Sequence, residues 1–136
     1  MERNCIRVLD SNIIYEISPL FIEDGCYDRS TMEEEFIATM NLYPDDICVV
    51  ISRDGENING FLVAHTVCGR DFCYLAQAYS RLYKEIAEEG MVILESWAKG
   101  LGLNEIRAET EKDSVAHRAF RNWDFKEHSI VMSRFI

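Results

Sequence analysis

The chain has 136 residues, enough for one domain that buries its own core without metal or disulfide support. Its formal net charge of −10 disfavours nucleic acid and anionic membranes as partners. No apolar run approaches the roughly 20 residues that span a bilayer, and the polar start MERNC lacks the apolar core of a signal peptide. We therefore expect one soluble domain over residues 1–136, located in the cytoplasm.

The sequence predicts no metal centre. Its three histidines, His65, His117 and His128, fall in three separate predicted elements, where surface or strand-edge positions are expected. The five cysteines form no CxxC pair and are expected to be small buried hydrophobes in a reducing compartment. A serine hydrolase is disfavoured too, because no serine lies in a GxSxG turn.

The first 45 residues predict a strand and two helices. A short strand over 5–9 precedes a helical pattern over 13–22, which Pro19 must kink or restart. Two overlapping capping boxes at 30–34 predict the start of a second helix, and Pro44 ends it.

The middle of the chain predicts an antiparallel meander, because three apolar runs are joined by short turns. These strands are expected at 47–53, 60–68 and 72–79. The third strand leads into an amphipathic helix from near Ser80 to Leu101, in which Gly90 indicates either a close neighbour or a bend.

The last third predicts a strand at 105–110, a helix capped by Asp113 or Ser114, and a strand at 125–135. The order is then β-αα-β-β-β-α-β-α-β. The strand–helix–strand unit over 72–110 needs a crossover, so its two strands should be parallel. We therefore expect an α/β (α+β) fold: a mixed, mostly antiparallel sheet of about six to seven strands with helices on both faces.

This order resembles that of the GNAT family, the Gcn5-related N-acetyltransferases. The resemblance spans nearly the whole chain by element order and is densest from Gly60 to Phe125. The residues that carry it are Gly60-Phe61-Leu62, Trp97-Ala98-Lys99, Gly102, Ile106, Ala108, Thr110, Ala116 and Phe125. It implies a GNAT-like fold, an acyl-CoA cofactor and an amine acceptor. The strand end Gln77-Ala78-Tyr79 also resembles a subgroup encoded by bacteriophages.

The resemblance places the pyrophosphate-binding loop of the family on Leu82–Ala87. There, a helix N-terminus and close backbone N–H groups would bind the anion. Ala87 fits the pattern, but Leu82 replaces an Arg or Gln and Glu85 replaces a glycine, so the loop is degenerate. A carboxylate at 85 opposes a diphosphate, which argues against acetyl-CoA or another acyl-CoA as a ligand.

The candidate site residues follow from this loop and the strand before it. The cofactor-binding candidates are Gln77, Ala78, Arg81, Leu82, Lys84, Ile86 and Ala87. The family's catalytic tyrosine aligns with Phe120, which has no proton to give, so Tyr79 and Tyr83 are the weak candidates for the acid. Each has an ordinary structural interpretation as well: Arg81 and Lys84 as solvated helix residues, and the tyrosines as aromatics at the edge of the core.

Two functions of different class remain open from the sequence. One is an acyl-CoA-dependent N-acyltransferase that transfers an acyl group directly from a thioester to an amine. The other is a catalytically inactive GNAT-fold protein that binds a protein partner or forms part of a virion or complex. In the first, the acidic run Glu33–Glu35 would attract the amine. A homodimer is plausible if the exposed end of residues 125–136 pairs with another chain.

Overall fold

The computed structural model describes residues 5–23, 25–81, 85–110, 113–128, 132 and 134. Its elements in chain order are β1 (Cys5–Val8), α1 (Ile13–Ile17), η1 (Ser18–Leu20), α2 (Arg29–Leu42), η2 (Pro44–Asp46), β2 (Ile47–Asp54), β3 (Asn57–Thr66), β4 (Phe72–Ser80), η3 (Glu85–Gly90), α3 (Met91–Gly100), β5 (Glu105–Arg107) and α4 (Val115–Asn122). The elements η1 and η2 are 3₁₀ turns, whereas η3 is a π-helix. None of the helices in these ranges is long and apolar enough to cross a membrane.

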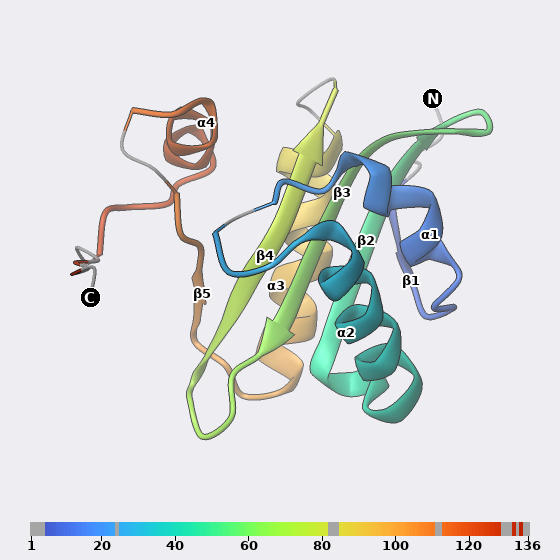
Figure 1. Ribbon diagram of the computed structural model, residues 1–136. Coiled ribbons are helices and arrows are strands. Elements are labelled where there is room, and N and C mark those ends of the chain that lie inside the picture. Colours follow the sequence, from blue (N-terminus) through green and yellow to red (C-terminus); the bar gives the residue numbers. More distant parts are fainter. Residues whose placement is uncertain are drawn as a thin grey trace.

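The described residues form a five-stranded mixed sheet in the order β1-β2-β3-β4-β5 (Figure 1). Neighbouring strands are antiparallel except β4 and β5, which are parallel. This confirms the predicted meander and the parallel pair after the crossover. The described residues hold five strands, fewer than the six to seven predicted. Residues 125–128, 132 and 134 are not in a strand, and the rest of the expected strand at 125–135 lies outside the described residues.

Helices cover both faces of the sheet, as expected. In Figure 1, α1 and α2 lie in front of the strands and α3 lies behind them. One hydrophobic cluster joins α1 and α2 to alternate strand residues such as Val49, Phe61 and Val63. A second joins α3 to the residues between them, such as Val50 and Leu62. The period-2 alternation of strands thus gives the sheet two buried faces.

The N-terminal helices follow the sequence signals, with one correction. Pro19 ends α1 and places the chain in the 3₁₀ turn η1. The predicted capping boxes at 30–34 were wrong, because the N-cap of α2 is Asp28. Its carboxylate accepts a hydrogen bond of 2.8 Å from the backbone N–H of Thr31, which satisfies one of the free donors of the first turn.

The helix predicted to start near Ser80 begins later. Ser80 is the last residue of β4, and the Arg81 N–H continues the ladder by donating to the Asn59 carbonyl at 2.8 Å. The described helix opens at Glu85 as a π-helix and becomes α-helical after Gly90. An added Cβ at Gly90 would lie 3.1 Å from Ile86 Cδ1. The predicted close neighbour of Gly90 is therefore Ile86.

Ile86 anchors this helix on the sheet. Its side chain is only 1% exposed and lies against Gly60 in β3, where an added Cβ would come within 2.4 Å of Ile86 Cγ1. The same Cβ would lie 3.1 Å from the backbone oxygen of Tyr79. Only glycine leaves room for this contact, so Gly60 sets how closely η3 approaches the strands.

Gly60→Ala should destabilise the protein by about 1–3 kcal/mol, because the added methyl overpacks the contact with Ile86. Thermal unfolding measures the change. Gly100→Ala is the matched control, since a Cβ there meets nothing within 4 Å. Equal melting temperatures for the two variants would show that Ile86 moves aside at no cost.

The Asp28 cap gives a pH-dependent prediction. The hydrogen bonds from Thr31 hold the pKa of Asp28 below its usual value of 3.8, so the carboxylate stabilises the folded state above that pH. Asp28→Ala should lower the melting temperature near neutral pH. The difference from the wild type should shrink as pH falls through the lowered pKa, where the stabilisation is lost. Asp28→Asn, which keeps an acceptor without a titrating charge, is the control. A difference that does not change with pH would contradict this role.

Candidate functional site

The strands β4 and β5, which border the candidate site, separate after a short paired region. Within the described residues, β4 pairs with β5 through three residue pairs, Phe72–Glu105, Cys73–Ile106 and Tyr74–Arg107. The Arg107 guanidinium lies 3.8 Å from the centre of the Phe72 ring, which adds a cation–π contact across this short paired region. Beyond it β4 runs on to Ser80, paired with β3 alone (Figure 1). Its other edge therefore carries backbone N–H and C=O groups that no strand of the described chain pairs.

A β-bulge lies just after the parting point. Val63 pairs with Gln77 and Ala64 pairs with Leu75, which leaves Ala76 as an extra residue in β4. A bulge breaks the in–out alternation of a strand. Accordingly, both Ala76 and Gln77 face α1 and α2, where Ala76 packs on the core cluster and Gln77 contacts Met32.

Gln77, predicted as a cofactor contact, uses its side chain within the protein. Its Oε1 accepts from the Ile22 N–H at 2.9 Å, and its Nε2 donates to the Ile22 carbonyl at 2.8 Å. The Nε2 also lies 3.2 Å from Met32 Sδ, and the residue is 6% exposed. Gln77 can therefore contact a ligand at the parted edge of β4 through its backbone rather than through its side-chain amide.

The other candidate site residues at the end of β4 lie on both faces of the sheet. Tyr79 stacks on Phe61 on the α1–α2 face, with ring centres 5.5 Å apart and an angle of 25°. Ala78 packs on the α3 face. Ser80 was missed by the sequence analysis. Its Oγ is buried and has no hydrogen-bond partner in the described part of the chain, a feature that no sequence pattern marks.

The predicted loop residues are only partly placed. Leu82, Tyr83 and Lys84 lie outside the described residues, so the structure does not bring them into or out of the site. Arg81 is exposed beside the end of β4, whereas Ile86 is a core residue. Ala87 lines a hollow of about 430 Å³ between α3 and the end of α4.

This hollow has an acidic lining. Its residues are Ala87, Glu88, Met91, Val92, Glu95, Asn122, Trp123 and Asp124. Three of them are carboxylates, and the apolar floor comes from α3 and the Trp123 ring. Phe120, where the family has its tyrosine, lies beside it and packs on Trp123 and Phe125 at 5.7 and 5.1 Å between ring centres.

A buried histidine joins the first turn of α4 to the segment that follows the helix. Ser114 caps α4, one of the two predicted caps. His117 is 9% exposed, contrary to the expected surface position. Its Nδ1 accepts from the Asp113 N–H at 2.8 Å, so Nε2 carries the proton and donates to Glu127 at 3.1 Å. Hydrogen bonding and the charge of Arg121, with a further hydrogen bond from His117, lower the pKa of the Glu127 carboxyl.

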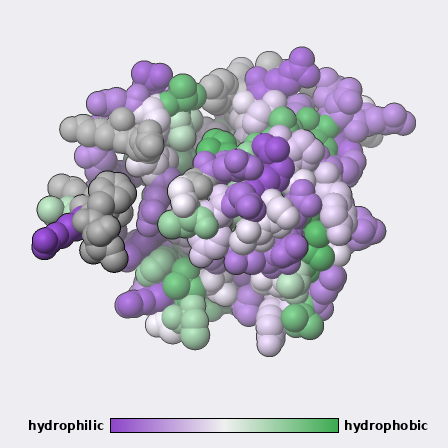
Figure 2. All heavy atoms as spheres, in the orientation of Figure 1, coloured by the Kyte–Doolittle hydropathy of each residue, from purple (hydrophilic) through white to green (hydrophobic). Residues whose placement is uncertain are grey.

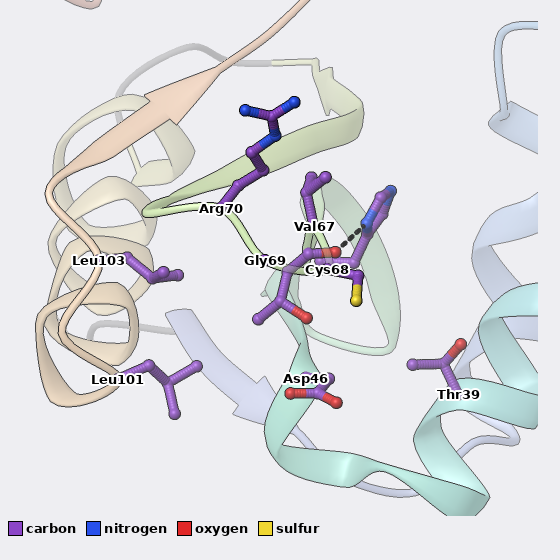
Figure 3. Close-up of a pocket in the computed structure, with 10 residues that line it drawn as sticks. Thr39, Asp46, Val67, Cys68, Gly69, Arg70, Leu101 and Leu103 are labelled. Carbon is purple, nitrogen blue, oxygen red and sulfur yellow. Dashed lines mark hydrogen bonds between the residues drawn. The ribbon is translucent and has the colours of Figure 1, made fainter.

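A second hollow, of about 540 Å³, lies at the opposite end of the sheet (Figure 3). It is lined by the β3–β4 turn, Thr39 of α2, Asp46 of η2, and Leu101 and Leu103 after α3. His65 donates from Nδ1 to the Thr66 carbonyl at 2.8 Å. No group of His, Cys, Asp and Glu in the described ranges has a geometry that could hold a metal ion.

Two of the five cysteines are buried, two are exposed and Cys5 is half-buried. Cys48 and Cys73 are fully buried, and burial raises the pKa of Cys48 to about 12 and that of Cys73 to about 11. Both are therefore inert as nucleophiles at neutral pH. Cys26 and Cys68 are exposed, contrary to the expectation that the cysteines are buried.

Thiol labelling of the native protein near pH 8 should modify Cys26 and Cys68 quickly and leave Cys48 and Cys73 unmodified until the chain unfolds, because only thiolates react. Mass spectrometry of labelled peptides identifies the sites, and labelling in denaturant is the control. Rapid native labelling of Cys73 would contradict the burial of β4 under α3.

No protein-family model matches the sequence, and no curated protein matches it. Solved structures do match its fold. The acetyltransferase AAC(6')-Iy, bound to a CoA-containing bisubstrate analog, has a TM-score of 0.73 at 12% identity, covering 100% of this chain and 99% of that one. Aminoglycoside 6'-N-acetyltransferase AAC(6')-IG from Acinetobacter haemolyticus has a TM-score of 0.67 at 17% identity, over 98% and 99%.

A third match is the PaiA N-acetyltransferase from Thermoplasma acidophilum in complex with coenzyme A. Its TM-score is 0.66 at 12% identity, over 91% of this chain and 89% of that one. Together with the mixed sheet and the parted strands, these likenesses show that the chain has the fold of the GNAT acetyltransferases. The likeness to the phage-encoded subgroup and the homodimer stay predictions.

Proposed function

We propose that the protein is an acyl-CoA-dependent N-acyltransferase that transfers an acyl group directly from the thioester to an amine. The observation that carries the proposal is the parting of β4 from β5 after three residue pairs, beside a bulge at Ala76. The parting leaves one edge of β4, from Leu75 to Ser80, unpaired by any strand of the described residues. The CoA complexes among the solved structures of this fold support the proposal.

The described residues fit an acyl-CoA in part. The pantetheine arm of CoA carries amide groups, which match the free backbone edge of β4 as an added strand would. Arg81 offers a cation for phosphate oxygens at the end of that strand, and the Ser80 hydroxyl lacks a described partner. When bound, acyl-CoA supplies an activated acyl group, and backbone N–H groups of β4 would polarise its carbonyl.

The charge on the α3 side opposes part of this ligand. Glu88, Glu95 and Asp124 line the hollow between α3 and α4 and would repel phosphates placed there. We therefore place the phosphates of the cofactor at the end of β4, near Arg81. Only neutral or basic groups are expected to bind in the hollow.

The acceptor is proposed to be a small amine that reaches β4 from the α1–α2 face. A net charge of −10 favours cationic ligands. In the predicted acidic run, Glu33 accepts from the Ser18 hydroxyl at 2.5 Å, whereas Glu34 and Glu35 are exposed. Only the exposed pair is available to attract an amine. Among the solved structures of this fold, one aminoglycoside acetyltransferase is bound to sisomicin.

The proposed reaction proceeds without a tyrosine at position 120. Phe120 has no proton to give and packs in the aromatic group with Trp123. The demand for an acid is small, because an ordinary thiol ionises near pH 8.5. Tyr79 lies at the end of β4 on the α1–α2 face, from which the amine is proposed to approach. It is therefore the candidate for an acid that assists the departure of the thiol.

A second proposal is a GNAT-fold protein without catalysis that binds a basic protein partner. The observation that favours it is the acidic hollow at the α3–α4 junction, with Phe120 used for packing. The first proposal is preferred because the second does not account for the parting of β4 from β5.

Acetyl-CoA should raise the melting temperature of the protein by several degrees at about 100 times its dissociation constant, since binding then contributes about 2.7 kcal/mol. Arg81→Glu should reduce this shift strongly by reversing the charge beside the phosphates. Arg70→Glu makes the same charge change at the other end of β4, in the turn before it, and should leave the shift intact.

The outcomes separate the two proposals. No shift for the well-folded wild type would reject the acyltransferase. Stable co-purification with a basic protein would then support the second proposal. Equal losses in the two arginine variants would show that general charge, rather than Arg81, governs binding. A shift that follows the expected pattern should be pursued by mass spectrometry of amines incubated with acetyl-CoA.

A further inference from the structure

We propose that Gln77 is a positioning residue: it fastens the acceptor-side segment to the donor strand where β4 leaves β5. The acceptor-side segment is defined as residues 21–23, which follow η1 and cross toward β4 (Figure 1). This inference rests on the proposed acyltransferase function. It assigns to the side chain a role that neither cofactor binding nor the fold alone requires.

The contact between Gln77 and Ile22 has the form of a pair of ladder bonds. The amide Oε1 accepts from the Ile22 N–H at 2.9 Å and Nε2 donates to the Ile22 carbonyl at 2.8 Å. One side chain thus replaces a neighbouring strand for this residue. Because Gln77 is 6% exposed, its amide needs such partners, and the bridge satisfies both ends of it.

The bulge at Ala76 makes this bridge possible. Regular alternation from Leu75, which packs on the α3 face, would turn residue 77 toward α3 as well. The extra residue turns it to the α1–α2 face instead. The bulge lies just after the end of β4–β5 pairing. It therefore also directs the Gln77 amide toward the acceptor-side segment. Gln77 is the only glutamine in the sequence.

The acceptor-side segment is held at two adjacent residues. Phe21 is 4% exposed and packs edge-on against Phe36 and Phe61, with ring centres 5.6 and 5.8 Å away. Gln77 holds the backbone of Ile22, whose own side chain is 63% exposed. The result is an apolar side chain presented to solvent at a fixed position beside the parted strand. An amine bound against β4 would meet this surface.

The test uses two variants of the full chain. Gln77→Met keeps the length of the side chain and removes both hydrogen bonds. Gln77→Glu keeps the acceptor for the Ile22 N–H and loses the donor unless its carboxyl group is protonated. Hydrogen exchange at the Ile22 amide measures the bridge. Initial rates of sisomicin acetylation, with each substrate varied in turn, measure its effect on the reaction; a mixed panel of primary amines replaces sisomicin if that compound is not acetylated.

Gln77→Met should speed exchange at Ile22 and raise the KM for the amine about tenfold, the loss expected for hydrogen bonds of this kind. The KM for acetyl-CoA should stay within about twofold, because the backbone edge of β4 is unchanged. Gln77→Glu should be impaired at neutral pH and recover at lower pH, where the protonated carboxyl group donates to the Ile22 carbonyl.

Val50→Ala is the control for general destabilisation, since Val50 is fully buried on the α3 face of the sheet, opposite to the face that Gln77 occupies. It should lower the melting temperature without changing the ratio of the two KM values. Unchanged exchange at Ile22 in Gln77→Met overturns the bridge. Faster exchange with an unchanged amine KM overturns the positioning role. If the wild type binds no acetyl-CoA and acetylates no amine of the panel, the proposed function fails and the positioning role with it, while the exchange result still judges the bridge.

Discussion

One extra residue in the fourth strand organises the candidate site. Without Ala76 as a bulge, β4 would present the same alternation along its whole length and would continue as a regular central strand. With it, the strand keeps its antiparallel pairing to β3 on one edge while its other edge separates from β5. On that edge β4 has backbone groups that no strand of the described residues pairs, and such groups in a folded protein need a partner from outside the sheet.

A second constraint keeps the helix after β4 close to that edge. Glycines at 60 and 90 leave the space that Ile86 occupies, so the side chain contacts both β3 and the turn of helix above it. The helix opens as a π-helix there, a rare form that recurs at functional sites. An added Cβ at Gly60 would meet both the Ile86 side chain, at 2.4 Å, and the backbone oxygen of Tyr79, at 3.1 Å, which makes this packing intolerant of larger residues.

The sequence predicted elements whose signals are local and failed where tertiary contacts decide. Hydrophobic alternation and short turns were sufficient for the meander, and the crossover rule for the parallel pair. Asp28 was overlooked as a cap because two capping boxes of stronger pattern lie just after it. The helix at Ser80 was placed too early since a serine after an apolar run is typical of a cap, yet here the strand pairing with β3 extends past it.

For the site, the sequence pointed to the end of β4, and the roles assigned to its residues stay predictions. Gln77 was chosen for its place at a strand end, whereas a bulge, which alternation cannot reveal, directs its amide to Ile22. His117 likewise gave no sign of burial, because its partner Glu127 becomes a neighbour only when the chain turns back after α4. The exposed apolar side chains are scattered among hydrophilic ones on the face in Figure 2, so surface hydropathy did not mark the site either.

The short parallel contact between β4 and β5 has a consequence for the order of folding. The strands β2, β3 and β4 are neighbours in sequence and close small loops, so they assemble at low entropic cost. The strand β5 must wait for the whole crossover helix and then gains three residue pairs. Among β2 to β5 it is therefore the last strand to dock and the first to detach in partial unfolding. The side of the sheet that opens most easily is the side from which the proposed thioester would enter.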